Sequence, residues 1–334
     1  MLKIGINGFG RIGRMILRAY IESMRKYDAI EITCINDLAD KKINLHLLKY
    51  DSTHGTLNFD VSETDNGISV AGKNITMISE SDPEKIDWAA NRVDIVFECS
   101  GRFTKKVDAE KHIKSGAKRV IVSAPSDGAD RTVVFGINHK EIINSDKVIS
   151  NASCTTNCLA PVAYLLEKAF GIDRGFMTTV HAYTGDQRLI DTAHKDLRRA
   201  RAAGMSIIPG TTGAAKAVGL VLPNLIGKLD GTAIRVPTPN VSLIDLKCTV
   251  RNPTTEDEIN NVMKSAAAGE LNGILKYNDE PLVSCDFNHS TFSSIFDATG
   301  TRIIGKHFCR VVAWYDNEFG FSNRMLDLAQ YLSN

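Results

Sequence analysis

Three glycines near the N-terminus constrain the fold of this chain more than any other feature. Gly8, Gly10 and Gly13 follow the strand-like run 3–7 and open the amphipathic segment 11–25. In this context the G-x-G-x-x-G pattern predicts a tight turn at Gly8, close approach of backbone N–H groups to a pyrophosphate at Gly10, and close helix packing at Gly13. The pattern therefore predicts a dinucleotide-binding βαβ unit and, with it, hydride chemistry.

An acidic residue supports the same interpretation. The second strand-like run, 30–35, ends in Asn36-Asp37. In dinucleotide-binding units, an acid about 20 residues after the glycine motif accepts hydrogen bonds from the adenosine ribose. Asp37 would also repel a 2′-phosphate, which favours NAD over NADP. The alternative is a glycine-rich turn followed by an unrelated acid at a strand end.

The rest of the first half continues this alternation. Further strand-like runs cover 93–98, 119–122 and 148–150, with a helical pattern at 105–115. Such βαβ repetition predicts a Rossmann-type, doubly wound parallel sheet within an α/β domain. We predict that this NAD-binding domain covers 1–153.

The pattern changes after residue 153. Strand-like runs at 176–180, 232–235, 242–250 and 310–314 are separated by helical patterns at 212–222 and 255–268. This order predicts an α+β catalytic domain over 154–316 with a mixed or antiparallel sheet. A helical segment within 317–334 is predicted to pack back on the first domain.

Composition excludes several classes of protein. The 334 residues exceed the usual size of a single core, and 40 basic against 39 acidic residues give a net charge of +1, which offers no general attraction to nucleic acid or an anionic membrane. We expect no membrane-spanning segment and no N-terminal leader. The seven scattered cysteines suggest reduced thiols in the cytoplasm, and no spacing suggests a metal site.

One cysteine stands where a nucleophile is expected. In the stretch Asn151-Ala152-Ser153-Cys154-Thr155-Thr156-Asn157-Cys158, Cys154 lies between the run 148–150 and the helical pattern 159–170. The N–H groups and dipole of a helix N-terminus favour a thiolate and lower its pKa. The alternative for Cys154 is a small buried apolar residue. Cys158, one helical turn later, is predicted to be a structural neighbour.

His181 is the best candidate for a base. It ends the run 176–180, and a strand, a helix and a strand in that order can return it towards Cys154. An imidazole there would hold the thiol ionised and shuttle a proton. Taken alone, His181 could equally be a satisfied polar residue at a strand end.

Other residues are suited to binding anions. Thr184 and Asp186 follow His181 in a turn, and Thr211-Thr212-Gly213 precedes the helical pattern 214–222, where free N–H groups are expected. Arg235 ends a strand. Arg198, Arg199 and Arg201 form a basic run, of which one member reaching inward would suffice; the sequence leaves open which one.

Several ordered motifs together carry a family resemblance. They are Asn7 to Gly13, Asn151 to Asn157, His194 to Ala202, Thr212-Gly213-Ala214-Ala215-Lys216, Arg235-Val236-Pro237-Thr238-Pro239-Asn240 and Trp314-Tyr315-Asp316-Asn317-Glu318. With these motifs the chain resembles the phosphorylating glyceraldehyde-3-phosphate dehydrogenase family almost from end to end.

The resemblance implies a complete glycolytic reaction. Cys154 would attack the aldehyde of glyceraldehyde 3-phosphate to give a thiohemiacetal, hydride would pass to NAD, and inorganic phosphate would cleave the thioester to 1,3-bisphosphoglycerate, with His181 assisting. The residues implied to contact NAD are Gly8, Gly10, Arg11, Ile12, Gly13, Asp37, Ser123 and Asn317, the last holding the nicotinamide carboxamide. Those implied to hold the two phosphates are Ser153, Thr155, Thr184, Arg199, Thr212, Gly213 and Arg235. Relatives are cytosolic homotetramers, and 188–203 resembles the loop that reaches a neighbour's cofactor site.

Some positions depart from the family pattern. Ser81 stands where many relatives carry Arg or Lys near the adenine, and Phe319 and Phe321 replace Trp and Tyr. Thr192-Ala193 replaces a Leu-Pro pair associated with strict NAD use, so use of NADP stays open.

Alternative functions also remain at this stage. They are an erythrose-4-phosphate dehydrogenase on the same scaffold, a Cys/His hydrolase that would leave the glycine motif without a role, and a binding protein that has lost catalysis.

Overall fold

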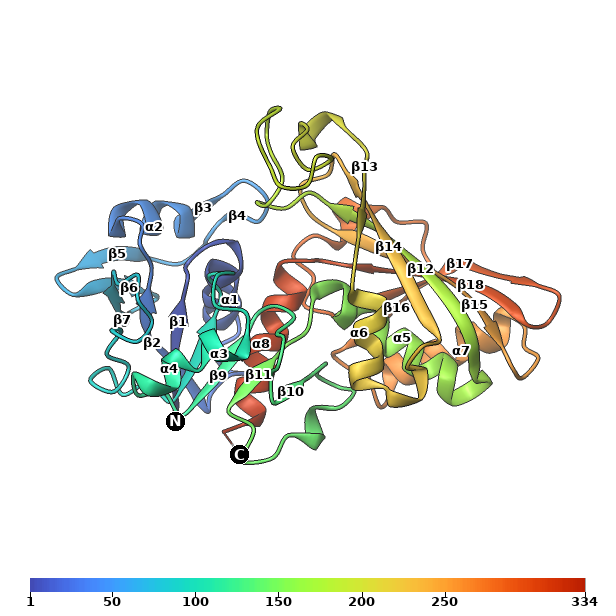
Figure 1. Ribbon diagram of the computed structural model, residues 1–334, viewed down its shortest axis with the longest axis horizontal. Coiled ribbons are helices and arrows are strands. Elements are labelled where there is room, and N and C mark those ends of the chain that lie inside the picture. Colours follow the sequence, from blue (N-terminus) through green and yellow to red (C-terminus); the bar gives the residue numbers. More distant parts are fainter. Residues whose placement is uncertain (334) are drawn as a thin grey trace. The chain divides into compact units, whose positions relative to one another are not determined.

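The computed structural model describes residues 1–333 and divides into two compact units. The first unit comprises Met1–Phe135, His139–Ser153 and Ser322 onwards, and the second comprises Gly136–Asn138 and Cys154–Phe321. Figure 1 shows the elements of both. Each unit is described by itself below.

The first unit is built on a nine-stranded sheet with the order β10-β11-β9-β8-β1-β2-β7-β6-β5. Strands β10 to β7 in this order pair in parallel, whereas β7, β6 and β5 form an antiparallel meander. The strands are β1 (Leu2–Asn7), β2 (Ile30–Asn36), β5 (Val61–Thr64), β6 (Gly67–Val70), β7 (Lys73–Ile78), β8 (Ile95–Glu98), β9 (Arg119–Val122), β10 (Arg131–Thr132) and β11 (Val148–Ser150). The predicted doubly wound parallel sheet is confirmed.

Three features of this unit were not predicted from the sequence. The segment between β2 and β8 contains α2 (Lys41–Lys49), the two-stranded sheet of β3 (Tyr50–Asp51) and β4 (Gly55–Thr56), and the antiparallel meander. Its strands are short and carry many polar residues, so their periodicity is weak. The meander turns at Ala71, whose φ of 50° is in the left-handed region, followed by Gly72.

The helices of the first unit are shorter than the sequence predicts. Helix α1 (Arg11–Glu22) ends before the predicted residue 25, because Ser23 closes it with an N–H to the carbonyl of Tyr20 and the chain then turns. The pattern at 105–115 forms two short helices, α3 (Lys106–Ala109) and α4 (Lys111–Lys114).

The second unit contains a seven-stranded mixed sheet with the order β13-β14-β12-β15-β18-β17-β16. Pairs β12–β14 and β16–β17 are parallel and the others are antiparallel, which confirms the predicted mixed sheet. The strands are β12 (Ile172–Ala182), β13 (Ile208–Thr211), β14 (Leu229–Val236), β15 (Ser242–Val250), β16 (Leu275–Asn278), β17 (Ser294–Ile304) and β18 (Phe308–Tyr315).

Helices pack on this sheet. Helix α5 (Cys154–Phe170) contacts β12, β15, β17 and β18, while α6 (Ala214–Val221) contacts β14 and α7 (Glu256–Ala268) contacts β16 and β17 (Figure 1). Alternate residues of β15, from Ser242 to Val250, are buried, as period-two alternation requires of a sheet with one covered face. Short 3-10 helices span His139–Glu141, Ala203–Met205, Pro223–Leu225 and Ser284–Phe287.

The last helix, α8 (Phe319–Tyr331), joins the first unit from Ser322 onwards. Its Asp327 accepts a hydrogen bond from the Tyr27 hydroxyl at 3.1 Å, and the Gln330 amide donates to Asp28 at 3.0 Å. These contacts hold the helix on that unit. Asn334, the last residue of the predicted segment 317–334, lies outside the described residues. No helix in the described part is long and apolar enough to cross a bilayer.

Candidate active site

The first unit contains a cavity of about 250 Å³ at the carboxyl ends of β1, β2 and β8. Its lining includes two of the predicted glycines, Gly8 and Gly10, together with Asp37 and Ser81. This is the edge of a parallel sheet at which nucleotides bind.

The three glycines are required for different reasons. Gly8 has a φ of 92°, and a Cβ there would lie 2.5 Å from the Cα of Ser100. A Cβ on Gly13 would lie 2.3 Å from the carbonyl oxygen of Gly8, so the start of α1 packs directly on the turn. Above Gly10, by contrast, there is open space. With no side-chain cap at Gly10, the first turn of α1, which contains Ile12, presents its backbone N–H groups in a form that fits a pyrophosphate.

Asp37 follows β2 and holds the glycine turn. Its carboxylate accepts the backbone N–H of Phe9 at 2.6 Å and that of Ala39 at 2.8 Å. The side chain is partly exposed at the cavity, as a ribose acceptor must be. Ser81, in the same lining, contacts Glu80 at 3.5 Å.

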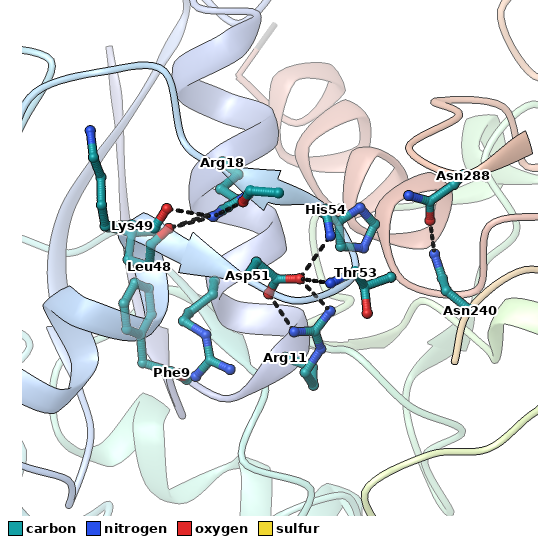
Figure 2. Close-up of polar contacts among 12 residues, drawn as sticks. Phe9, Arg11, Arg18, Leu48, Lys49, Asp51, Thr53, His54, Asn240 and Asn288 are labelled. Atoms are coloured by element: carbon teal, nitrogen blue, oxygen red, sulfur yellow. Dashed lines mark hydrogen bonds and ion pairs between the residues drawn. The ribbon is translucent and has the colours of Figure 1, made fainter. Parts of the chain in front are cut away.

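The side chain of Arg11 pairs with Asp51 on β3 (Figure 2). Burial alone would raise the pKa of Asp51, but hydrogen bonds and charge from Arg11, with the N–H groups of His54 and Thr53, lower the pKa of this carboxyl to about 2. The buried Arg18 side chain donates to the carbonyls of Leu48, Lys49 and Gly55. Through Asp51, the Arg11 guanidinium is therefore bound to the hairpin of β3 and β4.

A buried carboxylate is hydrogen-bonded to two residues that line the cavity, Asn7 and Ser100. Glu98, at the end of β8, accepts from the amide of Asn7 at 2.6 Å, from the N–H of Ser100 at 2.8 Å, and pairs with Nε2 of His112 at 2.9 Å. Ser123 follows β9 and donates its N–H to the Glu98 carbonyl at 3.0 Å. Ser123 thus stands at the same edge of the sheet as the glycine turn.

In the second unit, helix α5 begins at Cys154, as the sequence predicts. The chain enters it through Ala152, whose φ of 55° is a left-handed conformation that is uncommon outside glycine. Ser153 is the last residue of the first unit. The Cys154 sulfur lies 3.5 Å from Nε2 of His181, near the end of β12. The structure therefore brings the predicted nucleophile and base into contact.

Burial shifts the pKa values of both members of this pair. Burial raises the pKa of the Cys154 thiol, although the Arg235 charge and hydrogen bonds from Thr155 and the backbone oppose the rise. Burial and Arg235 lower the pKa of His181 to about 3. The helix N-terminus and the imidazole were expected to favour a thiolate; burial opposes the charged form of both groups.

Arg235, near the end of β14, contacts the second ring nitrogen of His181. Its Nη1 lies 2.8 Å from Nδ1 of His181 and donates to the carbonyl of Ala182 at 3.0 Å. That carbonyl is also 2.7 Å from Nδ1. With Nδ1 accepting from Arg235, the ring proton sits on Nε2 and faces sulfur; with Nδ1 donating to Ala182, Nε2 accepts the thiol proton. Both neutral tautomers have partners, which suits a proton shuttle.

Tyr315 contacts residues on both sides of this pair, Thr155 beside Cys154 and the ring of His181. Its hydroxyl lies 2.9 Å from the hydroxyls of both Thr155 and Thr179, and its ring stands edge-on to His181 with centroids 5.9 Å apart. The Thr155 hydroxyl, implied to hold phosphate, is thus engaged with a buried tyrosine. Sequence reasoning gave Tyr315 no role.

The candidate anion ligands lie around the same unit. Thr184 follows β12, and Gly213 is the N-cap of α6, with the Thr212 hydroxyl accepting the N–H of Ala214 at 3.1 Å. Of the three arginines left open, Arg199 pairs with Asp186 and its charge acts on Arg235. Arg201 pairs with Asp191 at 2.8 Å, and the Arg198 guanidinium contacts the Pro209 carbonyl at 3.5 Å. Of the three arginines, Arg199 is therefore the one whose charge affects the pKa of Arg235, beside His181.

Asn317 lies just before α8 and is buried. Its Oδ1 accepts from the hydroxyl of Ser242 at 2.8 Å, and that hydroxyl accepts the N–H of Ala182 at 3.0 Å. Ser242 was another residue that the sequence did not single out. Within residues 1–333, no group of three or more His, Cys, Asp or Glu side chains is arranged to hold a metal ion.

Comparisons with known proteins agree with this geometry. Residues 2–106 match the family model for the NAD-binding domain of glyceraldehyde 3-phosphate dehydrogenase, and residues 153–317 match that for its C-terminal domain. The glyceraldehyde-3-phosphate dehydrogenase of Geobacillus stearothermophilus is 56% identical over 334 residues, covering 100% of this chain and 98% of that protein. Glyceraldehyde-3-phosphate dehydrogenase 1 of Bacillus cereus is 54% identical over 335 residues, covering 100% and 99%. The chain belongs to the glyceraldehyde-3-phosphate dehydrogenase family.

Proposed function

We propose that this protein is an NAD-dependent enzyme that oxidises glyceraldehyde 3-phosphate and phosphorylates the product to 1,3-bisphosphoglycerate. The contact of 3.5 Å between Cys154 sulfur and His181 Nε2, beside Arg235, carries the proposal. The names and full-length identity of the relatives support it.

Cys154 and His181 perform the first half of the reaction. The thiol sulfur bonds to the aldehyde carbon while the thiol proton passes through His181 Nε2 to the aldehyde oxygen, which gives a thiohemiacetal and leaves His181 neutral again. The backbone N–H of Cys154 at the start of α5 and the His181 ring stabilise the developing oxyanion. Bound NAD would supply the hydride acceptor for the thiohemiacetal carbon. As hydride leaves, His181 takes the hydroxyl proton and a thioester remains on Cys154.

The second half uses inorganic phosphate. A phosphate oxygen attacks the thioester carbonyl, the carbon–sulfur bond breaks, and Cys154 leaves as a thiolate that is reprotonated. A thioester retains free energy that hydrolysis to a carboxylate would lose. Transfer of the acyl group to phosphate, and not to water, keeps that energy in the product. We assign the substrate and attacking phosphates to Arg235, Arg199, Thr184, Ser153, Thr155 and the Thr212-Gly213 turn.

The residues of the first unit fit a dinucleotide. Open space above Gly10, an uncapped helix start at Arg11 and Ile12, and the carboxylate of Asp37 would hold the pyrophosphate and ribose. Ser123 completes the contacts assigned in this unit. In the second unit, Asn317 is assigned to the nicotinamide carboxamide.

Assembly and location are part of the same proposal. Segment 188–203 exposes Leu189 and Leu197, at 86% and 84%, which suits burial against a second copy in a homotetramer. All seven cysteines are free thiols, in keeping with a cytoplasmic protein. Sedimentation of the purified protein would test the tetramer, and a stable monomer would contradict it.

A steady-state assay tests the activity. NADH should form continuously only when glyceraldehyde 3-phosphate, NAD and phosphate are all present. The same assay with NADP measures cofactor preference, and with erythrose 4-phosphate it tests the alternative aldehyde. Equal or higher kcat/KM for the tetrose would replace the proposed substrate.

A further inference from the structure

Ser242 connects the strand of the proposed base to the proposed nicotinamide ligand. It is the first residue of β15, is 1% exposed, and lies between the N–H of Ala182 and the Oδ1 of Asn317, at 3.0 and 2.8 Å. Ala182 follows His181 directly, and Asn317 is separated from Ser242 by 75 positions in sequence. One hydroxyl therefore joins two parts of the site that are distant in sequence.

The hydrogens of this chain can be assigned from donor and acceptor chemistry. The backbone N–H of Ala182 can only donate, so the Ser242 oxygen accepts there. Within the described residues, the remaining partner of the hydroxyl is Asn317, to which it donates its own hydrogen. The carbonyl oxygen of the Asn317 amide therefore accepts the hydrogen bond from Ser242. The NH₂ group of the same amide points away from Ser242 and can donate to another group.

The backbone on either side of Asn317 is held independently. The buried carboxylate of Asp316 accepts the N–H groups of Glu318 and Phe319 at 2.9 and 2.8 Å. Its other oxygen accepts from Asn240 at 2.9 Å, and Asn240 also donates to Asn288 at 2.8 Å (Figure 2).

The residue before Ser242 has an unusual backbone conformation. Val241, which follows Asn240, has a φ of 67°, a rare conformation for a β-branched residue. Such a conformation persists only where the surroundings fix it.

We propose that Ser242 is a positioning residue that fixes the side-chain amide of Asn317 with its NH₂ group directed to the carbonyl oxygen of the nicotinamide carboxamide. The inference rests on the proposed function, because it takes Asn317 as the carboxamide ligand. Without the Ser242 hydroxyl, the amide can rotate by half a turn and present its oxygen instead. An amide oxygen facing the carboxamide oxygen repels it, so the nicotinamide end binds less tightly.

Binding of NAD compared with ADP-ribose tests this role. ADP-ribose lacks the nicotinamide ring and its carboxamide but retains the adenosine and pyrophosphate. For Ser242→Ala we expect Kd for NAD to rise about tenfold, as for the loss of one well-placed hydrogen bond, with Kd for ADP-ribose unchanged. Ser294→Ala is the matched control, since Ser294 is equally buried, at 0% exposure, and lies on β17 of the same sheet; it should leave both constants unchanged.

A second variant protects the test against misfolding. Asn317→Asp keeps an oxygen acceptor for Ser242 but loses the NH₂ donor, so it should weaken NAD and spare ADP-ribose. Adding Ser242→Ala to Asn317→Asp should then produce no further loss, because the hydroxyl acts through the amide.

The outcomes separate the two proposals. Equal weakening of NAD and ADP-ribose in Ser242→Ala, unchanged NAD binding, or additive effects in the double variant would each overturn the role of Ser242 alone. Failure of the wild-type protein to bind NAD would overturn the proposed function as well.

Discussion

The Nε2 atom of His181 lies 3.5 Å from the sulfur of Cys154, and Nδ1 of the same ring lies 2.8 Å from Nη1 of Arg235. The imidazole therefore lies between the proposed nucleophile and a cation. Burial and, after it, the charge of Arg235 lower the pKa of His181, which favours the neutral form of the ring.

Replacing each cysteine of the motif separately tests which one reacts. Cys154→Ala should abolish turnover while NAD still binds. Cys158→Ala is the matched control: this thiol is fully buried, lies 3.5 Å from the Ser294 hydroxyl, and should be dispensable for chemistry. Activity assays and NAD titration of both variants check this, and retained turnover in Cys154→Ala would refute the assignment.

Removing the imidazole should slow both catalysis and thiol chemistry. For His181→Asn we expect kcat to fall by about 10²- to 10⁴-fold, the usual contribution of a general base. Because the pKa of Cys154 is raised by burial, the thiol needs a proton acceptor at neutral pH, so iodoacetamide should alkylate the variant more slowly. An alkylation rate equal to that of wild type would show that His181 does not activate the thiol.

Asp37 should determine the choice between the two cofactors. In Asp37→Asn the amide oxygen can still accept the N–H of Phe9, but the charge that repels a 2′-phosphate is gone. The ratio of kcat/KM for NADP to that for NAD should rise about tenfold or more, a change of at least about 1.4 kcal/mol. Asp40→Asn, at the exposed N-cap of α2, is the control and should leave this ratio unchanged.

The ion pair of Arg11 and Asp51 makes a pH-dependent contribution to stability. The folded pKa of Asp51 is about 2, below its ordinary value of 3.8. Its stabilisation is thus complete above about pH 4 and is lost as pH falls through 2. Asp51→Asn should cost roughly 2 kcal/mol in the free energy of unfolding at pH 6 and less at pH 3. Urea unfolding at both values measures this; a cost that does not shrink with acid would contradict it.

The regular elements were predictable where the hydrophobic pattern was strong. Strands β9 and β15 have the predicted bounds, and helix α5 begins at the predicted nucleophile. The meander β5–β7 was missed because its strands are short and partly polar.

Contacts distant in sequence could not be predicted from local patterns. The pairing of Ser242 with Asn317 depends on how β15 lies beside the start of α8, and the role of Tyr315 depends on two threonines from different elements. The pKa shifts of Cys154 and His181 arise first from burial, which a motif does not report.

The central claim is that Cys154 carries the substrate as a thioester that phosphate cleaves. Rapid mixing of the enzyme with glyceraldehyde 3-phosphate and NAD in the absence of phosphate tests it most directly. We predict a burst of no more than one NADH per chain, absent in Cys154→Ala, followed by continuous turnover once phosphate is added. Continuous NADH formation at the full rate without phosphate, or an undiminished burst in Cys154→Ala, would contradict the account.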